Sequence, residues 1–554
     1  MNALRPLCLI LFSAMLSAQP IPASSPTPFT PGNYTDNRSK EIERVFRAHL
    51  EFLGGDVCEG RAPGSRGEMV AIQYIVSQMK LLGLKPGVGD SYVQPVPIIG
   101  ISTGRSAALE ARGSNGTGSF RFLDEFVAFP GITRPEVAID ADVVFVGYGI
   151  VAPKERWDDF KGVDVKGKVL LILNDDPNTD DPDFFAGKGR TYYGRWTYKF
   201  EEAARRGAAG AIIIHTTPSA GYPWQVVQSS WSRERYTLPP VPGVPQLPMN
   251  SWLTFDAAKN LTGLGGHTLE KLIGVAQSRD FQPVPLGVRV RSLLKNTIRP
   301  IESANVVGIL PGSDPTLRNQ HIIYTAHHDH FGIGRPIKGD SIYNGALDNA
   351  AGVATMLAAA SEFVHTTPQP KRSIIFCTVT GEEFGLIGSQ YYCEHPTVPA
   401  SALTANINIE GAGILGPSSD VVQIGMGHSS IDDDVKAVAG NLRLIVKPDP
   451  EPDKGSFFRS DQFNFVKIGV PAAYVGSGRD IVGKPAEWGK EMEDSYVAET
   501  YHQPTDEIKP WWNFAGAVQT VQFQYLLGLR LANADAPPTW KSGTEFGSVR
   551  TQTK

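Results

Sequence analysis

The stretch His321–His330, which reads HIIYTAHHDH, decides the fold of this 554-residue chain. It opens with a mostly apolar run of the kind that forms a buried strand, and the run ends in histidines and one aspartate. His327 and Asp329 are two positions apart, so on a strand their side chains point to the same side. A histidine with a neighbouring carboxylate is the usual arrangement of a metal ligand and the group that orients it. The stretch therefore predicts a strand whose end carries a metal-binding group.

Strands and helices alternate on both sides of this stretch. Apolar strands are expected at 304–310, 321–326, 373–379, 405–409 and 471–475, and helices at 345–365, 384–393, 428–440 and 513–532. Alternation over short links indicates an α/β fold, with a mostly parallel or mixed central sheet flanked by helices. In such sheets ligands bind beyond the carboxyl ends of the strands. The strand ends are therefore where we look for a functional site.

Groups that can hold a metal or move a proton follow successive strand ends: Asp348, Glu382, Glu383, Glu410 and, after a later loop, His502. Each has an ordinary alternative, such as a surface histidine cluster, an N-cap aspartate or a solvated charge pair at a helix start. Their occurrence in order favours a site instead. Two histidines and three carboxylates could hold two zinc ions with one bridging aspartate. One glutamate of the adjacent pair would bind metal, and the other would be free for proton transfer.

Composition and the N-terminus narrow the class of protein. Lys and Arg number 52 and Asp and Glu 57, a net charge of -5, which disfavours a nucleic-acid partner. Residues 1–20 combine a positive start, a ten-residue apolar run and small residues, which is typical of a signal peptide. No other apolar run is long enough to span a membrane, so we expect no integral membrane segment in the mature chain. The protein is expected to be exported, to the periplasm or the medium.

Several stretches resemble the co-catalytic zinc aminopeptidase-like family, family 28 of the metallopeptidases. The matching stretches are AHHDHFGIG (326–334), YNGALDNAAG (343–352), TGEEFGLIGS (380–389), ANINIEGAG (405–413), RSDQFNFVKIGVP (459–471) and YHQPTDE (501–507). Near the N-terminus, Glu59-Gly60-Arg61 and Gly64 resemble the family's EGR-x-x-G stretch. The resemblance implies a zinc exopeptidase fold of the phosphorylase/hydrolase-like type.

The resemblance also implies a role for each strand-end group. His327 and Glu410 would bind one zinc ion and Glu383 and His502 the other, with Asp348 bridging both. Asp329 would orient His327. Glu382 would be the general base that takes a proton from the attacking water and delivers it to the leaving amine.

Four residues in the matching stretches have a less defined role: Glu410, His328, His330 and Arg459. The family more often has Asp at the position of Glu410, so a carboxylate is kept there but is one methylene longer. His328 and His330 we interpret as packing residues or as neighbours of the ligands. Arg459 matches a family stretch near the substrate cleft, where it could help to shape the cleft; a salt-bridged loop is the alternative.

The chain is expected to divide into five parts. Residues 1–20 are the signal peptide, 21–134 a leader and the N-terminal part of the peptidase domain, and 135–280 an inserted module. Residues 281–535 are the catalytic zinc peptidase domain, and 536–554 a polar tail. The inserted module resembles a protease-associated domain through Gly147-Tyr148-Gly149, Lys166-Gly167-Lys168 and the stretch that begins at Ala203-Ala204.

The sequence thus predicts an exported dizinc exopeptidase that acts on peptides or small proteins, with aminopeptidase as the first choice. A carboxypeptidase of the glutamate-carboxypeptidase type is one alternative, but it would need clustered arginines, and only Arg459 stands near the motifs. A glutaminyl cyclase shares part of the motif but usually lacks the insertion. A non-catalytic, receptor-like binding protein is the alternative from another class, although such proteins lose metal ligands.

Overall fold

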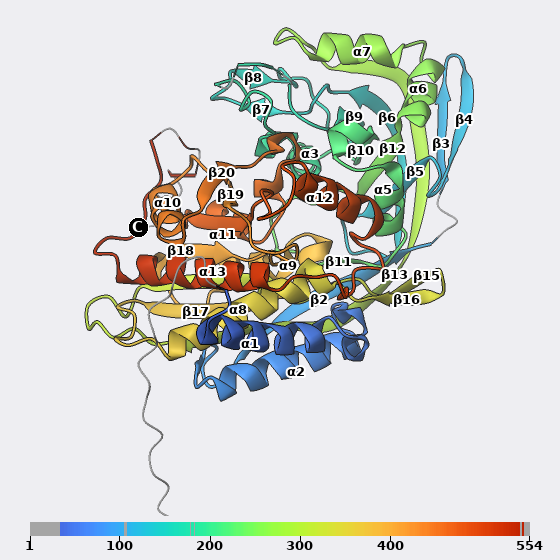
Figure 1. Cartoon of the computed structure of the whole chain (residues 1–554). Coiled ribbons are helices and arrows are strands. Elements are labelled where there is room, and N and C mark those ends of the chain that lie inside the picture. The colour runs from blue at the N-terminus through green and yellow to red at the C-terminus, as the bar shows by residue number, and fades with distance from the viewer. Residues whose placement is uncertain are drawn as a thin grey trace, which may run out of the picture.

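The computed structural model describes residues 34–104, 108–177, 179–181, 183–542, 544 and 546–547. The predicted signal peptide, residues 1–20, lies outside these residues, as does the end of the predicted tail. The described chain forms two units (Figure 1). The site-bearing unit comprises residues 34–103 and 296–542, and the inserted unit comprises residues 108–295. Among the described residues, no helix combines the length and the apolar character needed to cross a bilayer.

The site-bearing unit is built on a mixed sheet with a parallel core. The four parallel strands are, in spatial order, β17 (Ser373–Val379), β14 (His321–His327), β18 (Leu403–Asn408) and β21 (Ala472–Ser477). At one edge β13 (Val284–Leu310) pairs antiparallel with β17, and β2 (Val93–Thr103) pairs antiparallel with β13. At the other edge β19 (Asp420–Ile424) pairs antiparallel with β21 and parallel with β20 (Ile445–Pro448). This arrangement confirms the predicted α/β fold with a mixed central sheet.

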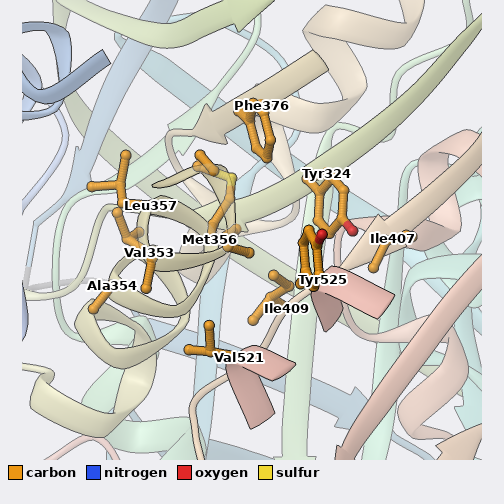
Figure 2. Packing of buried hydrophobic residues seen from close by; sticks show 14 of the residues in the cluster. Tyr324, Val353, Ala354, Met356, Leu357, Phe376, Ile407, Ile409, Val521 and Tyr525 are labelled. Carbon is orange, nitrogen blue, oxygen red and sulfur yellow. The ribbon is translucent and has the colours of Figure 1, made fainter. Parts of the chain in front are cut away.

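Helices cover both faces of this sheet. One face carries α1 (Asn37–Leu53), α2 (Arg66–Leu81), α8 (Ala351–Val364), α10 (Ile431–Leu442) and α13 (Ala515–Asn533), and the other carries α9 (Ile387–Glu394) and α11 (Gln462–Lys467). Side chains of β14 alternate between the two layers, because Tyr324 packs with the first set and Ile323 with the second. Figure 2 shows Tyr324 and Phe376 of the sheet against Met356 of α8 and Tyr525 of α13.

α8 is buried almost all round, which fits its apolar sequence AGVATMLAAASEFV. It begins at Ala351, six residues later than the expected helix 345–365. Asp348, in the preceding turn, has non-helical φ −109° and ψ 90°. The backbone N–H groups of Leu347 and Asp348 donate to the carboxylate of Asp506, which fixes this turn outside the helix.

The inserted unit has a second mixed sheet. Its strands are, in spatial order, β5 (Phe126–Pro130), β12 (Met249–Thr254), β10 (Gly210–His215), β9 (Val169–Leu173), β6 (Glu136–Phe145), the first half of β13, β3 (Ala108–Gly113) and β4 (Gly116–Arg121). Hydrophobic clusters fill both of its faces. The sheet therefore extends beyond the predicted boundaries 135–280 on both sides, because β3 to β5 precede residue 135 and β13 follows residue 280.

The remaining elements are short. The helices of the inserted unit are α3 (Trp196–Arg205), α4 (Thr217–Ala220), α5 (Trp224–Trp231), α6 (Phe255–Leu264) and α7 (Leu269–Ala276), and α12 (Trp488–Glu499) belongs to the site-bearing unit. The other strands are β1 (Lys85–Pro86), β7 (Val151–Ala152), β8 (Trp157–Asp158), β11 (Arg235–Thr237), β15 (Gly332–Ile337) and β16 (Asp340–Tyr343).

β13 joins the two units as one unbroken strand of 27 residues, visible along the right of Figure 1. Its residue Lys295 still pairs with Glu136 of the inserted unit, and the next residue, Asn296, already pairs with Thr103 of the site-bearing unit. A second link comes from β11, a segment of the inserted unit that pairs with β2. The two units are therefore joined through backbone hydrogen bonds as well as through side chains.

Candidate active site

The ends of three neighbouring strands bring the predicted groups together. β14 ends at His327, which lies in register with Val379 at the end of β17, and Thr325 lies beside Asn408 at the end of β18. Because these strands are parallel, the segments that follow them leave the sheet at the same edge. Glu382 and Glu410 stand on two of those segments.

The first cluster surrounds His327. Its Nε2 lies 3.2 Å from Oδ1 of Asp348 and 3.2 Å from Oε2 of Glu410. One ligand atom from each of these residues lies within 4.8 Å of the other two, close enough for all three to bind one cation. The predicted first ligand set is thus assembled.

The second cluster shares Asp348. Nε2 of His502 lies 3.3 Å from Oδ2 of Asp348 and 3.1 Å from Oε2 of Glu383, as predicted. His330, which we expected to serve packing or to neighbour the ligands, also lies here: its Nδ1 is 2.5 Å from Oε1 of Glu383, and it offers a ligand atom together with Asp348 and Glu383. The second cluster therefore holds one imidazole more than predicted. His328 remains a packing residue beside Glu68.

Asp329 links the first cluster to Glu382. Its backbone carbonyl accepts from Nδ1 of His327 at 3.2 Å, and its carboxylate lies 3.7 Å from the same nitrogen. Because a carbonyl only accepts, Nδ1 is the donor in this contact, and Nε2 is the ring nitrogen that faces Asp348 and Glu410 and can bind a metal. The carboxylate also accepts from the backbone N–H of Glu382 at 3.0 Å. Asp329 thus orients both the imidazole and the segment that carries Glu382.

The longer side chain of Glu410 is held on both oxygens. Oε2 accepts from Asn349 at 2.9 Å, and Oε1 accepts from Asn408 at 3.0 Å and from the Ser460 hydroxyl. These neutral donors restrict the carboxylate without neutralising it. The extra methylene relative to aspartate is therefore accommodated in one fixed position facing His327.

Burial and mutual charge shift the pKa values of this cluster. Burial by itself lowers the pKa of both histidines, but Glu410 and Glu382 hold the pKa of His327 well above its ordinary value, and Glu383 and Asp348 raise that of His502 to about 9. Burial raises the pKa of Asp348, but hydrogen bonds from the two histidines outweigh it and lower this pKa well below the usual range. For Glu382, burial dominates and raises the pKa well above its ordinary value. The cluster thus attracts positive charge, and Glu382 is the carboxylate best suited to carry a proton.

Sequence reasoning assigned no role to two buried residues that position the cluster. Arg61 donates from Nε to the His328 carbonyl at 2.7 Å, and its other nitrogens donate to the carbonyls of Asn344 and Gly345 at 2.6 and 2.9 Å. The carboxylate of Asp506 accepts from the backbone N–H groups of the consecutive residues Leu347 and Asp348, at 3.1 Å in each case. Both residues stand inside stretches that match the family, EGR-x-x-G and YHQPTDE, so the signal was present.

A cavity of about 700 Å³ lies over the cluster and continues to the inserted unit. His327, Asp348, Glu382 and His502 line its floor. Arg459 lines it too, with its guanidinium carbon 6.0 Å from the ring centre of Tyr222 in the inserted unit. The predicted place of Arg459 beside the cleft is consistent with this position.

The donor set fits zinc. Imidazole nitrogens and carboxylate oxygens converge in two groups that share one aspartate. Nε2 of His502 and Oε1 of Glu383 are buried and have a group of opposite character within 3.1 Å, but neither makes a well-oriented hydrogen bond within the described part of the chain. Buried polar atoms of native proteins normally have partners, and two cations between these groups would supply them.

Comparison with known proteins agrees with this geometry. Residues 305–526 match peptidase family M28. Aminopeptidase NAALADL1 of Rattus norvegicus is 26% identical over 392 residues, which cover 60% of this chain and 48% of that protein. The protein of the same name from Mus musculus is 30% identical over 351 residues, covering 52% of this chain and 42% of that protein. The chain thus spans about half the length of these curated relatives.

The fold has a solved counterpart in the aminopeptidase from Aneurinibacillus sp. strain AM-1. The two structures superpose with a TM-score of 0.51 at 19% identity, over 89% of this chain and 95% of that one. At this identity the likeness concerns the fold alone. Since the overlap is much longer than residues 305–526, it includes most of the inserted unit as well.

Proposed function

We propose that this chain, which belongs to peptidase family M28, is a dizinc exopeptidase and acts as an aminopeptidase on peptides or small proteins. The observation that carries the proposal is the convergence of His327, Glu410, Glu383 and His502 on Asp348, with Glu382 beside them. The two relatives named aminopeptidase support the direction of cleavage.

Zinc bound to these residues would polarise the scissile carbonyl and provide a hydroxide nucleophile at neutral pH. His327 and Glu410 would hold one ion, Glu383 and His502 the other, and Asp348 would bridge the two. His330 stands as an additional donor to the second ion. The hydrogen bonds to Glu410 and His327 keep these ligands in place before the metal arrives.

Glu382 is the proton carrier in this proposal. It takes a proton from the attacking water and delivers it to the amine that leaves. Its raised pKa, caused by burial, makes the protonated form accessible, so one residue serves as base and then as acid. The bond from its backbone N–H to Asp329 fixes the segment that carries it.

A blocked-peptide series tests the direction of cleavage. We expect a peptide with a free amine to be hydrolysed, its N-acetylated form to resist, and mass spectrometry to find the N-terminal residue among the products. Release of the C-terminal residue, unaffected by acetylation, would instead establish a carboxypeptidase.

Zinc analysis tests the enzyme class against the receptor-like alternative. The five donors predict about two zinc ions per chain after reconstitution and dialysis. Less than one ion per chain, together with no hydrolysis of any peptide, would favour a non-catalytic binding protein.

We further propose that the protein is exported and that the inserted unit is a protease-associated domain that covers the cleft. Residues 1–20 support export, and the position of the inserted unit over the cavity supports a covering role. N-terminal sequencing of protein from the periplasm or the medium tests the first point. An intact Met1 on protein that stays in the cytoplasm would contradict it.

A further inference from the structure

His502 is oriented in a different way from His327. The Nδ1 atom of His327 donates to the Asp329 carbonyl, so a hydrogen bond fixes that ring. The Nδ1 atom of His502 is buried and has no hydrogen-bond partner in the described part of the chain. The orientation of the His502 ring therefore depends on packing.

Aromatic rings supply this packing. The imidazole of His502 stacks on the ring of Tyr501 with 3.6 Å between the ring centres, and the ring of Phe331 meets it edge-on at 4.6 Å. Phe331 also meets the imidazole of His330 edge-on, at 4.9 Å. Stacked and edge-to-face ring pairs are favourable arrangements. One phenyl ring thus contacts both imidazoles of the second cluster.

Phe331 is held in turn by Arg233 of the inserted unit. The guanidinium carbon of Arg233 lies 5.1 Å from the centre of the Phe331 ring and 4.3 Å from that of Tyr343. Its Nη1 donates to the Phe331 carbonyl at 3.4 Å. A cation over an aromatic face is attracted by the ring, more strongly where water is excluded, and Phe331 is only 9% exposed. Arg233 therefore fixes both the ring and the backbone of Phe331.

Tyr236 makes a second contact from the same segment of the inserted unit. Its ring centre lies 4.3 Å from that of Phe384, which directly follows Glu383 in the chain. The rings of Phe384 and Phe331 are themselves 5.7 Å apart. Arg233 and Tyr236 thus rest on two neighbouring phenyl rings, one beside the histidines and one next to Glu383.

The segment that carries these side chains is fixed to the site-bearing unit. In the pairing of β11 with β2, Tyr236 lies opposite Gly100. Glu234 accepts from two nitrogens of Arg299 on β13, at 2.8 and 2.6 Å. Both side chains therefore approach the second cluster from an anchored strand.

The first cluster is held within the site-bearing unit. Asp329 orients His327, and Glu410 accepts hydrogen bonds from Asn349 and Asn408. All of these residues lie outside the inserted unit. The two clusters thus differ in the unit that positions their ligands.

We propose that Arg233 and Tyr236 are positioning residues for the second metal site, so that the inserted unit sets the affinity of the second zinc ion and leaves that of the first unchanged. They act through Phe331 and Phe384, which hold the ligands in place and exclude water. Loss of groups that orient metal ligands costs about 10–100-fold in metal affinity. This inference rests on the proposed dizinc site, and it gives the inserted unit a role beyond covering the cleft.

Competition with a zinc chelator tests the proposal. The titration yields two dissociation constants for the wild-type protein. The His502→Gln variant identifies the constant of the second site, because it removes a ligand of that site alone. In Arg233→Leu and in Tyr236→Leu, we expect this constant to rise by about 10–100-fold and the other constant to stay unchanged.

Conservative variants and a control from the same segment separate positioning from a general loosening of the segment. Tyr236→Phe keeps the ring and should retain the wild-type affinity, and Arg233→Lys keeps the cation and should retain part of it. Glu234→Gln removes the ion pair with Arg299 between the same two positions and should leave both constants unchanged. Two folded leucine variants in which both constants stay at the wild-type value, or rise equally, would overturn the proposal.

The same measurement distinguishes this inference from the proposed function. Wild-type protein that binds less than one zinc ion per chain would contradict the dizinc site and, with it, this inference. Two bound ions in the wild type, with unchanged constants in both leucine variants, would refute only the role of Arg233 and Tyr236. Since zinc binding is measured without turnover, the result does not depend on which peptide the protein cleaves.

Discussion

Glu382 and Glu383 are adjacent in sequence and have opposite electrostatic settings. Burial dominates at Glu382 and raises its pKa, whereas His502 and His330 offset the effects of burial and of Asp348 at Glu383 and leave its pKa lowered. The sequence already predicted that one would bind metal and the other would transfer protons. In the structure His502 and His330 lie beside Glu383, whereas His327 lies nearer Glu382 and does not offset its burial.

The first prediction at this scale concerns Glu382→Ala. We expect the variant to retain zinc and to lose about 10²–10⁴ in turnover, the usual contribution of a general acid–base group. Zinc content and kcat measured on the same preparation check this. Glu394→Gln, an exposed glutamate that accepts from Gln390 on α9, serves as control and should leave kcat unchanged. Normal turnover in Glu382→Ala would remove the assigned role.

The second prediction concerns pH. In the metal-free protein the pKa of His502 is raised from 6.5 to about 9. Below that pH the imidazole carries a proton that zinc must displace, so zinc affinity should rise with pH through this range. The raised pKa also stabilises the metal-free fold fully below pH 6.5, and this contribution is lost as the pH rises through about 9.

Chelator competition at several pH values between 6 and 8 measures the affinity, and thermal unfolding of the metal-free protein measures the stability. Affinity independent of pH across this interval would show that His502 is unprotonated before zinc binds. The zinc-loaded protein provides the comparison, because its imidazoles cannot titrate while they bind metal.

Some residue roles could be predicted from sequence and others could not. His327 ends one predicted strand and Glu410 follows another, and parallel strands end at one edge, so the meeting of these two residues was foreseeable. Arg61 could not be placed in the same way, because its partners are the backbone carbonyls of a loop 267 or more residues away. Such contacts produce no periodic pattern in the sequence from which they could be predicted.

At the scale of elements, the buried strands and helices agree with their sequence patterns, and the differences concern boundaries. The expected helix 345–365 loses its first turn to the contacts of Asp506, as described above. The periodic pattern of apolar residues indicates the buried face of a helix. It does not show where backbone N–H groups at the start bond to a side chain such as Asp506 and so set the first helical residue.

The contact of α13 with β14 gives a testable prediction about packing. A Cβ atom added at Gly528 would lie 1.9 Å from the Tyr324 hydroxyl oxygen, which donates to the Gln524 carbonyl at 2.6 Å. Gly528→Ala should therefore destabilise the protein by about 1–3 kcal/mol through overpacking. Thermal unfolding of the variant measures this loss.

Gly440 in α10 supplies the control. It is exposed, and a Cβ atom there meets nothing within 4 Å, so Gly440→Ala should stabilise by about 0.5–1 kcal/mol through helix propensity. If both variants shift the melting temperature in the same direction, the close approach at Gly528 does not limit the packing of this face.

At the scale of the whole molecule, sequence reasoning identified two folded units but placed their border within the inserted sheet. The strand pattern of residues 108–130 is too irregular to reveal that β3 and β5 pair with strands beyond residue 135. The same limit hid which residues line the cavity between the two units. Arg195 and Arg235 precede Arg459 by more than 200 residues, and only the tertiary structure brings all three to one cavity.

The unbroken strand β13 has a mechanical consequence. Consecutive residues Lys295 and Asn296 pair with strands of different units, so no unpaired residue remains between them to act as a hinge. Swinging the inserted unit away would require bending a strand that is hydrogen-bonded along its length, and the pairing of β11 with β2 opposes the same movement. The cavity between the two units would then keep a nearly constant width. The protein would select peptides by size, because only those that fit the rigid cavity could enter, and it would not close around a bound peptide.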